Sequence, residues 1–128
     1  MSYDKSLSIF APNGKLSQVD YAKESVKKGG LSIGLIADNC VIIAAERKAV
    51  PKLQDPRTIK KINKVDNHIF ISYAGIIADS RSLIDYVRLE SQSYRYSLDT
   101  VPSLEYISKQ IAFRQQEYKF LYKFLFII

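Results

Sequence analysis

The spacing of apolar and polar residues along the chain predicts one helix, then paired strands, then two more helices. The first helix is predicted from Ser17 to Lys28, because apolar residues recur there with helical spacing. Ser17 is expected to cap its start and Gly29 to cap its end. The apolar stripe is narrow, so this helix is expected to lie on a surface; the stripe consists of Val19, Ala22 and Val26.

A reverse turn is expected just before this helix, at residues 11–14, which have the sequence APNG. Proline presets its own φ angle, and an Asn-Gly pair tolerates positive φ. The chain is therefore expected to reverse direction or bend here.

Four strands are expected after the helix, arranged as two antiparallel hairpins. Turn chemistry at Asp38-Asn39 and at Asp66-Asn67 separates the two members of each pair. The second strand is apolar on both faces, which is typical of a strand in the middle of a covered sheet. The expected strands are Leu31–Ala37, Cys40–Glu46, Ile59–Val65 and His68–Ala74.

Two amphipathic helices are expected next, from Ile77 to about Tyr96 and from Ser103 to about Tyr122. Pro102 suits the start of the second helix. Helices laid on antiparallel strands make the expected fold class α+β. The apolar faces consist of Leu83, Ile84 and Val87 with Ser91 in the first helix, and of Leu104, Ile107, Ile111 and Tyr118 in the second.

The segment 118–128, with sequence YKFLYKFLFII, is abruptly apolar. Its only charged residues are Lys119 and Lys123. It is too short to span a bilayer and too apolar for a solvated end. Two interpretations stay open: a buried final helix turn, or sequence that is not the original ending of the chain.

Composition and charge fit one folded domain of 128 residues. The formal net charge of +6 raises nucleic-acid binding as an alternative. The basic residues are scattered, however, and lack interleaved aromatic residues for base stacking. We therefore expect no nucleic-acid partner, and a small basic binding module is kept only as an alternative.

The numbers of cysteines and histidines limit which disulfides and metal sites the chain could form. Cys40 is the single cysteine, which excludes an internal disulfide, and His68 is the single histidine, with no second metal ligand nearby in the sequence. We expect no metal and no other cofactor. The first residues lack the apolar core of a signal peptide, and no run reaches the length of a membrane span, so we expect an intracellular protein with no membrane partner.

The N-terminal stretch from Tyr3 to Gly29, YDKSLSIFAPNGKLSQVDYAKESVKKG, resembles the signature of proteasome alpha subunits. That signature runs YDR, then FSPDGRL, then QVEYA and KKG. Matching segments continue in order to about Tyr118, as KLQDPRTIKKI, ISYAGIIADSRSLID, VRLESQSYR and LEYISKQIA. The KLQD and ESQS segments most resemble the type-7 kind of alpha subunit, found at ring position four.

The resemblance implies a fold and domain limits. The fold is the N-terminal part of the four-layer αββα sandwich of N-terminal nucleophile hydrolases, with antiparallel sheets and an added N-terminal helix. Residues 1–128 would then be one incomplete alpha-type domain, truncated relative to the family after about Tyr118. Its expected parts are a gate segment and outer helix at 1–29, strands and two helices at 30–117, and an atypical apolar tail at 118–128.

The resemblance also implies a function. It is that of a non-catalytic structural and gating subunit of the 20S proteasome alpha ring, which supports ubiquitin-dependent protein degradation. The implied partners are the other alpha subunits of a seven-membered ring, the beta ring and regulatory-particle activators. The implied location is the cytoplasm and the nucleus.

Four residues match the family's gate cluster, in which contacts between adjacent N-termini hold the channel open. A phenol supplies a donor and a flat apolar face, a carboxylate supplies an acceptor, and proline stiffens the turn. Without the resemblance, the first two would be a frayed terminus and the last an ordinary helix tyrosine. The cluster consists of Tyr3, Asp4, Pro12 and Tyr21.

Three further residues match a pocket that receives the C-terminal carboxylate of an activator. Lys61 matches the lysine that contacts this carboxylate, an interaction that a flexible ammonium makes well. Gly29 and Gly75 match backbone positions that line the same pocket. From the residues alone, Lys61 would be an ordinary solvated lysine of a strand.

No catalytic residue is expected. Catalytic sister subunits carry a threonine at a new N-terminus, where hydroxyl and α-amine act together. The matching residue here is Gly30, which has no hydroxyl and whose nitrogen lies in a peptide bond. Glu46 and Lys61 match an acid and a lysine of those subunits, so a catalytic hydrolase of the same fold is an alternative, against which Gly30 argues directly.

Overall fold

A computed structural model describes residues 9–48, 52–117 and 124–127 of the chain, which form an α+β fold with antiparallel sheets. The sequence predicted this class and both hairpins, and the structure confirms them. In chain order the elements are α1 (Ser17–Lys27), β1 (Ser32–Ala37), β2 (Cys40–Ala45), the short 3-10 helix η1 (Pro56–Thr58), β3 (Ile62–Asp66), β4 (Ile69–Gly75), α2 (Ile77–Leu98), α3 (Leu104–Glu117) and β5 (Phe124–Ile127).

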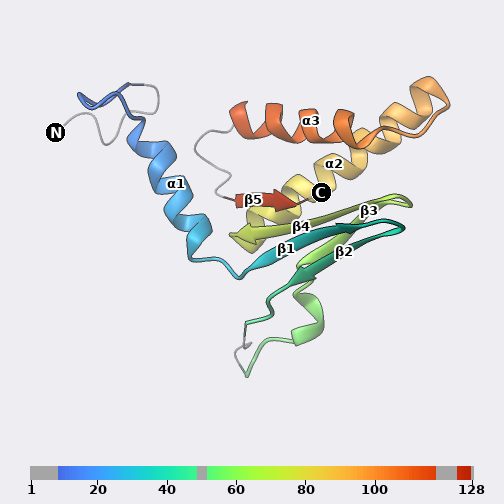
Figure 1. Cartoon of the computed structure of the whole chain (residues 1–128), viewed down its shortest axis with the longest axis horizontal. Coiled ribbons are helices and arrows are strands. Elements are labelled where there is room, and N and C mark those ends of the chain that lie inside the picture. The colour runs from blue at the N-terminus through green and yellow to red at the C-terminus, as the bar shows by residue number, and fades with distance from the viewer. Residues whose placement is uncertain (1–8, 49–51, 118–123, 128) are drawn as a thin grey trace.

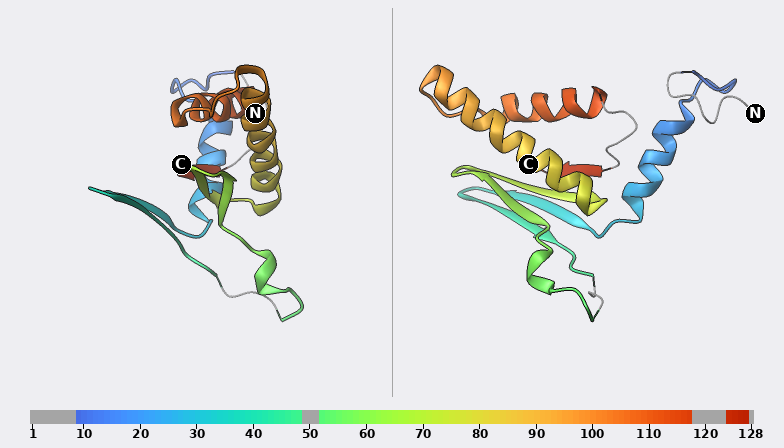
Figure 2. Two further views of the ribbon diagram at one scale, coloured as in Figure 1. Left: turned by 90° about the vertical axis from the view of Figure 1, so that its right-hand side faces the viewer. Right: turned by 180° about the vertical axis from the view of Figure 1, so that it is seen from behind.

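The described strands form two sheets. The first is the β1–β2 hairpin, and the second has the order β3-β4-β5, so that β4 lies in its middle. Helices α2 and α3 lie on one side of the three-stranded sheet and the β1–β2 hairpin lies on the other (Figures 1 and 2). Helix α1 projects from one end of the molecule, where it lies against β4 and β5.

The hydrophobic core lies between the three-stranded sheet and the two long helices. Aliphatic residues of β3 and β4 face the apolar stripes that the sequence predicted for α2 and α3. Tyr86 and Tyr106 pack against the edge of this core. The buried cluster consists of Val65, Ile69, Ile71, Leu83, Val87, Ile107 and Ile111.

The β1–β2 hairpin has a different environment from the one predicted. The sequence placed Cys40–Glu46 in the middle of a covered sheet, but most of β2 is exposed and β2 pairs only with β1 in the described part of the chain. Ile36 of the adjoining strand is 89% exposed. An apolar pattern predicts a strand, but what covers that strand depends on the tertiary structure.

The ends of the helices differ slightly from the prediction. Leu16, with extended backbone, precedes the first residue of α1, so Ser17 is the first helical residue and makes no cap with its side chain. Gly29 N–H donates to the Val26 carbonyl just after the helix ends. At the start of α3, Ser103 is the capping residue, because its hydroxyl accepts from the Tyr106 N–H at 3.2 Å.

One predicted boundary was wrong. The sequence placed His68 in a strand, but the turn of the β3–β4 hairpin consists of Asn67 and His68, and the His68 ring is hydrogen-bonded to the Pro102 carbonyl. One of the two interpretations left open for segment 118–128, a buried final helix turn, is also wrong for its described residues, because Phe124–Ile127 forms β5 and pairs with β4. Aromatic and β-branched residues suit a strand beside the open edge of β4.

Candidate binding site at the C-terminal end of helix α1

The end of α1 meets β1 and β4 at two glycines. A Cβ on Gly29 would lie 2.5 Å from the backbone nitrogen of Gly75 and 2.9 Å from the Val26 carbonyl oxygen. Gly75 itself has a φ of 126°, a conformation that favours glycine. The two backbones therefore touch closely because neither residue carries a side chain.

Lys61 reaches this junction from the segment just before β3. Its Nζ donates to the carbonyl oxygen of Gly30 at 2.8 Å. A Cβ on Gly30 would lie 2.6 Å from the same Nζ. The structure thus places Lys61, Gly29 and Gly75 around one short turn, although 46 residues of sequence separate Gly29 from Gly75.

Glu46 fixes the other side of the junction. Its Oε2 accepts from the Leu31 N–H at 2.9 Å, and its own N–H donates to the Leu31 carbonyl at 2.7 Å. These bonds hold the exit of β2 against the entry of β1. The Glu46 carboxylate therefore lies beside Gly30. Both it and the Lys61 ammonium lie close to the position that a Cβ on Gly30 would occupy.

The electrostatics of Lys61 follow from this setting. Burial lowers the pKa of Lys61 below its ordinary value, the nearby Glu46 carboxylate opposes that shift, and Lys48 adds to it. A partly desolvated ammonium interacts more strongly with an anion than a fully hydrated one does.

Lys48 is a site residue that the sequence analysis did not identify. Its Nζ donates to the Lys28 carbonyl at 2.9 Å, at the end of α1 where helix carbonyls lack intrahelical partners. Twenty residues separate the two lysines, so neither helical nor strand periodicity could have indicated this contact.

A cavity of about 310 Å³ opens beside this junction. Its lining residues come from the stretch between the last turn of α1 and the start of β1, together with Glu46, which follows β2, and Ala74 of β4. The lining residues between the end of α1 and the start of β1 are Val26, Lys27, Gly29, Gly30, Leu31 and Ser32.

The gate residues predicted from the sequence lie elsewhere or outside the described residues. Tyr3 and Asp4 lie outside the described residues. Pro12 lies in the predicted reverse turn, where the Gly14 N–H donates to the Ala11 carbonyl at 2.8 Å and Gly14 has a φ of 76°. Tyr21 lies on α1 and is 48% exposed. The gate cluster stays a prediction.

Comparison with known proteins identifies the family of this chain. The sequence profile described as "Proteasome subunit" matches residues 26–126, which is most of the chain. The chain belongs to the proteasome subunit family. The match also includes residues 118–126, most of the segment that the sequence analysis set apart as atypical.

Relatives of this proteasome-family chain are named as alpha-type subunits. It is 44% identical over 116 residues to "Proteasome subunit alpha type-7" of Caenorhabditis elegans and 47% identical over 116 residues to the protein of the same name in Dictyostelium discoideum. It is 44% identical over 117 residues to "Proteasome subunit alpha type-4" of Saccharomyces cerevisiae. Each match covers 91% of this chain and 46% of the relative, so the chain spans about half the length of the curated relatives it matches.

The described residues of this proteasome-family chain contain no group of His, Cys, Asp and Glu side chains that could hold a metal. Among its described helices, none is long and apolar enough to cross a bilayer. Cys40 is exposed and carries a free thiol.

Proposed function

We propose that this chain acts as a non-catalytic structural and gating subunit of the 20S proteasome alpha ring. Its partners would be the other alpha subunits of a seven-membered ring, the beta ring and regulatory-particle activators. In that role it would support ubiquitin-dependent protein degradation in the cytoplasm and nucleus. The observation that carries the proposal is the meeting of Lys61, Gly29 and Gly75 at the end of α1.

The proposed docking chemistry is recognition of a C-terminal carboxylate. Lys61 supplies the cation, and the backbones of Gly29 and Gly75, which approach each other closely beside it, are both partly exposed. A charge-assisted hydrogen bond of this kind is shorter and stronger than a neutral one. The carboxylate would take the place that the Gly30 carbonyl now occupies on the Lys61 ammonium.

The absence of peptidase activity is proposed from residue 30. Lys61 and Glu46 both converge on the position where a side chain would start, but Gly30 has none. A nucleophile and a base are both needed for covalent hydrolysis, and neither is present at this position. The purified chain should not cleave fluorogenic peptides; turnover that copurifies with the chain and is abolished by an inhibitor of threonine-type proteases would contradict this.

The docking proposal is tested by replacing Lys61. The chain is labelled and titrated with an activator-derived peptide that ends in a free carboxylate, and with the same peptide carrying a C-terminal amide. Lys61→Ala should weaken binding of the free-acid peptide about tenfold, because a charge-assisted hydrogen bond is lost. The amidated peptide should bind weakly to both proteins.

Lys64→Ala is the matched control, since Lys64 lies on β3, close to Lys61 in the sequence, and its Nζ bonds to the Asn67 side chain. The control removes the same charge and should leave binding unchanged. Equal loss in both variants would indicate that net charge alone attracts the peptide, and unchanged binding in Lys61→Ala would reject the proposed role.

A ring role is tested by coexpression with the other alpha-type subunits. Native mass spectrometry should then detect this chain in ring assemblies. If the chain is absent from every such assembly and instead binds RNA with a steep salt dependence, it would be a basic binding module and not a ring subunit.

A further inference from the structure

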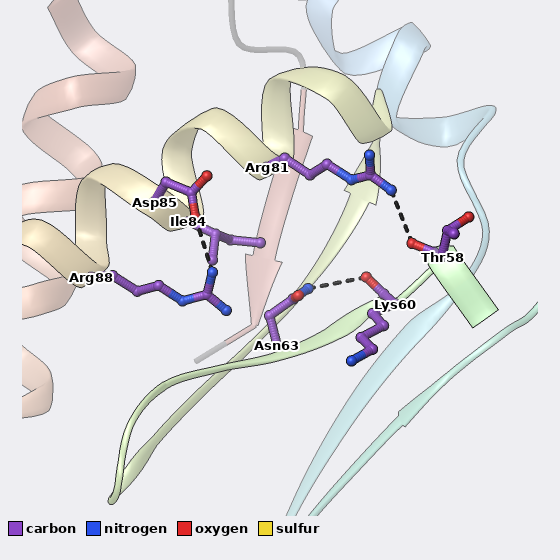
Figure 3. A pocket seen from close by; sticks show the side chains of 7 residues that line it. All are labelled: Thr58, Lys60, Asn63, Arg81, Ile84, Asp85 and Arg88. Carbon is purple, nitrogen blue, oxygen red and sulfur yellow. Dashed lines mark hydrogen bonds and ion pairs between the residues drawn. The ribbon is translucent and has the colours of Figure 1, made fainter.

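A second pocket lies between α2 and the segment that joins η1 to β3, away from the α1 junction (Figure 3). Its volume is about 340 Å³. Three cationic side chains line it, Lys60 from the segment before β3 and Arg81 and Arg88 from α2. Asp85 is the one acidic residue of the lining, so these four side chains carry a net charge of +2 (three positive and one negative).

Arg88 is already committed to holding α2 against the edge of the sheet. Its Nε and Nη2 donate to the Lys64 carbonyl at 3.1 and 3.0 Å, and its Nη1 pairs with the Asp85 carboxylate at 2.9 Å. The negative charge in the lining is thereby paired with Arg88. The remaining positive charge belongs to Lys60 and Arg81.

Arg81 and Lys60 have donors to spare. Arg81 uses Nη2, which donates to the Thr58 carbonyl at 2.9 Å and so holds the guanidinium at the pocket wall. Its Nε and Nη1 have no acceptor within the part of the chain that the structure describes. The Lys60 ammonium likewise has no hydrogen-bond or ion-pair partner in residues 9–48, 52–117 and 124–127.

Asn63 adds a neutral donor to the same space. Its Nδ2 donates to the Lys60 carbonyl at 3.0 Å, which leaves the second hydrogen of this amide group available. The close-up shows Asn63 and Lys60 on the strand side and Arg81 on the helix side of the pocket (Figure 3). Asn63 and Arg81 therefore present donors from two elements to one solvent-accessible space, and Lys60 contributes to its wall with a flexible side chain whose ammonium is drawn pointing away from Arg81.

The donor set identifies a class of ligand. A planar guanidinium matches the geometry of a phosphate, and a lysine adds a compact charge beside it. A phosphate monoester carries a charge of about −1.5 to −2 at neutral pH, which complements the lining. Ile84 is the only apolar residue that lines the pocket, so there is little surface on which a nucleobase could pack.

We propose that this pocket binds a phosphate group, either free or as the monoester of a small polar molecule, through Arg81, Lys60 and Asn63. Arg88 positions the helix that carries Arg81. The cavity is larger than one phosphate ion needs, which leaves room for a sugar attached to it.

Isothermal titration in a chloride buffer with inorganic phosphate, ribose 5-phosphate and ribose tests this proposal. Both phosphate compounds should bind saturably and ribose should not. Tighter binding of ribose 5-phosphate than of inorganic phosphate would assign the site to a monoester, and equal affinities would assign it to free phosphate. No saturable binding of either phosphate compound would overturn the proposal.

Lys60→Gln and Arg81→Gln should each weaken phosphate binding about tenfold or more, because each removes a charged donor. Lys109→Gln is the control, since Lys109 lies on α3 and pairs with Glu105. If Arg81→Gln loosens the fold, Lys60→Gln still decides the matter, because the Lys60 ammonium supports no described contact. Wild-type affinity in Lys60→Gln would overturn the proposal.

Discussion

At Gly29 the missing side chain is a steric requirement, because a Cβ would press on backbone atoms of both Gly75 and Val26. Backbone atoms cannot swing aside as the end of a side chain can. Gly14 differs, since its φ of 76° is the only obstacle to a side chain and nothing lies within 4 Å of its Cβ position. The two glycines therefore allow steric crowding and backbone strain to be measured separately.

Gly29→Ala should lower the free energy of unfolding by about 3 kcal/mol, as overpacking against rigid backbone does. Gly14→Ala should cost about 1 kcal/mol, the usual penalty for a side chain with left-handed backbone. Urea unfolding of the three proteins measures both values. Equal losses of stability in the two variants would show that the α1–β4 junction relaxes around the added methyl group.

Asp66 is the most strongly perturbed acid among the described residues. Burial alone would raise the pKa of its carboxyl, but hydrogen bonds from the Asn67 N–H and the Ser91 hydroxyl, together with the Arg95 guanidinium, lower that pKa to about 2. The ordinary value is 3.8. The carboxylate thus connects the end of β3 to the last turns of α2.

The pH dependence of stability follows from this lowered pKa. The contribution of Asp66 should be fully present above about pH 4 and should be lost as the pH falls through about 2, because only the unfolded chain binds the proton in that interval. Asp66→Asn should remove this part of the pH dependence and lower stability at pH 7 by about 2 kcal/mol.

Measuring the free energy of unfolding at pH 7, 4 and 3 tests this, because the contribution of Asp66 is complete at the first two values and partly lost at about pH 3. Asp85→Asn is the control, because Asp85 is exposed and its pair with Arg88 is on the surface. If Asp66→Asn retains the acid-induced loss seen in the unchanged protein, another carboxyl group is responsible for it.

At the scale of elements, α2 and the β1–β2 hairpin contribute unequally to stability. Leu83 of α2 is fully buried, whereas Leu35 of β1 is 59% exposed. Leu83→Ala should therefore cost about 3 kcal/mol and Leu35→Ala less than about 1 kcal/mol. Thermal or urea unfolding of the two variants compares them directly, and a larger loss in Leu35→Ala would place the main core at the hairpin.

The helices show what the sequence could predict. Helical spacing identified the buried stripe of α2 correctly, since Leu83, Ile84 and Val87 are all buried. Turn chemistry located the β3–β4 hairpin but placed its turn one residue too early, at Asp66-Asn67 and not at Asn67-His68, because both pairs are acceptable in a tight turn. The sequence also left a final helix turn open as one interpretation of the segment in which β5 forms, since a short apolar run suits either structure and only its pairing with β4 decides.

The candidate site was predictable to a similar extent. The family resemblance indicated Lys61, Gly29 and Gly75, and the structure brings them together. Lys48 carried no comparable signal, because its contact with the Lys28 carbonyl joins two segments whose approach depends on the whole fold. The phosphate pocket was not predicted for the same reason, as Lys60 and Arg81 come from different elements.

At the scale of the whole molecule, the side of the β1–β2 hairpin that faces β3 and β4 is notably apolar. A hollow of about 350 Å³ lies there, bordered by both hairpins and by the start of α3. Exposed apolar surface of this kind favours association. The residues around the hollow are Ile36, Val41, Ile43, Ile62, His68, Phe70 and Leu104.

The isolated chain should therefore self-associate as its concentration rises. A double variant with Ile36→Lys and Val41→Lys should shift the chain toward the monomer, because charge disfavours apolar contact. Sedimentation velocity over a concentration series measures this, with circular dichroism to check that the fold is kept. If the unchanged chain stays monomeric over the whole concentration series, this apolar face does not drive self-association.

The hydrogen bond between Lys61 and the Gly30 carbonyl has a thermodynamic consequence for any anion that reaches the α1 junction. Such a molecule exchanges one acceptor for another, so its affinity reflects the difference between two contacts and not the full strength of the new one. Residence at this site is therefore expected to be brief for a single carboxylate. Long-lived binding would require several weak contacts made simultaneously by one multivalent partner.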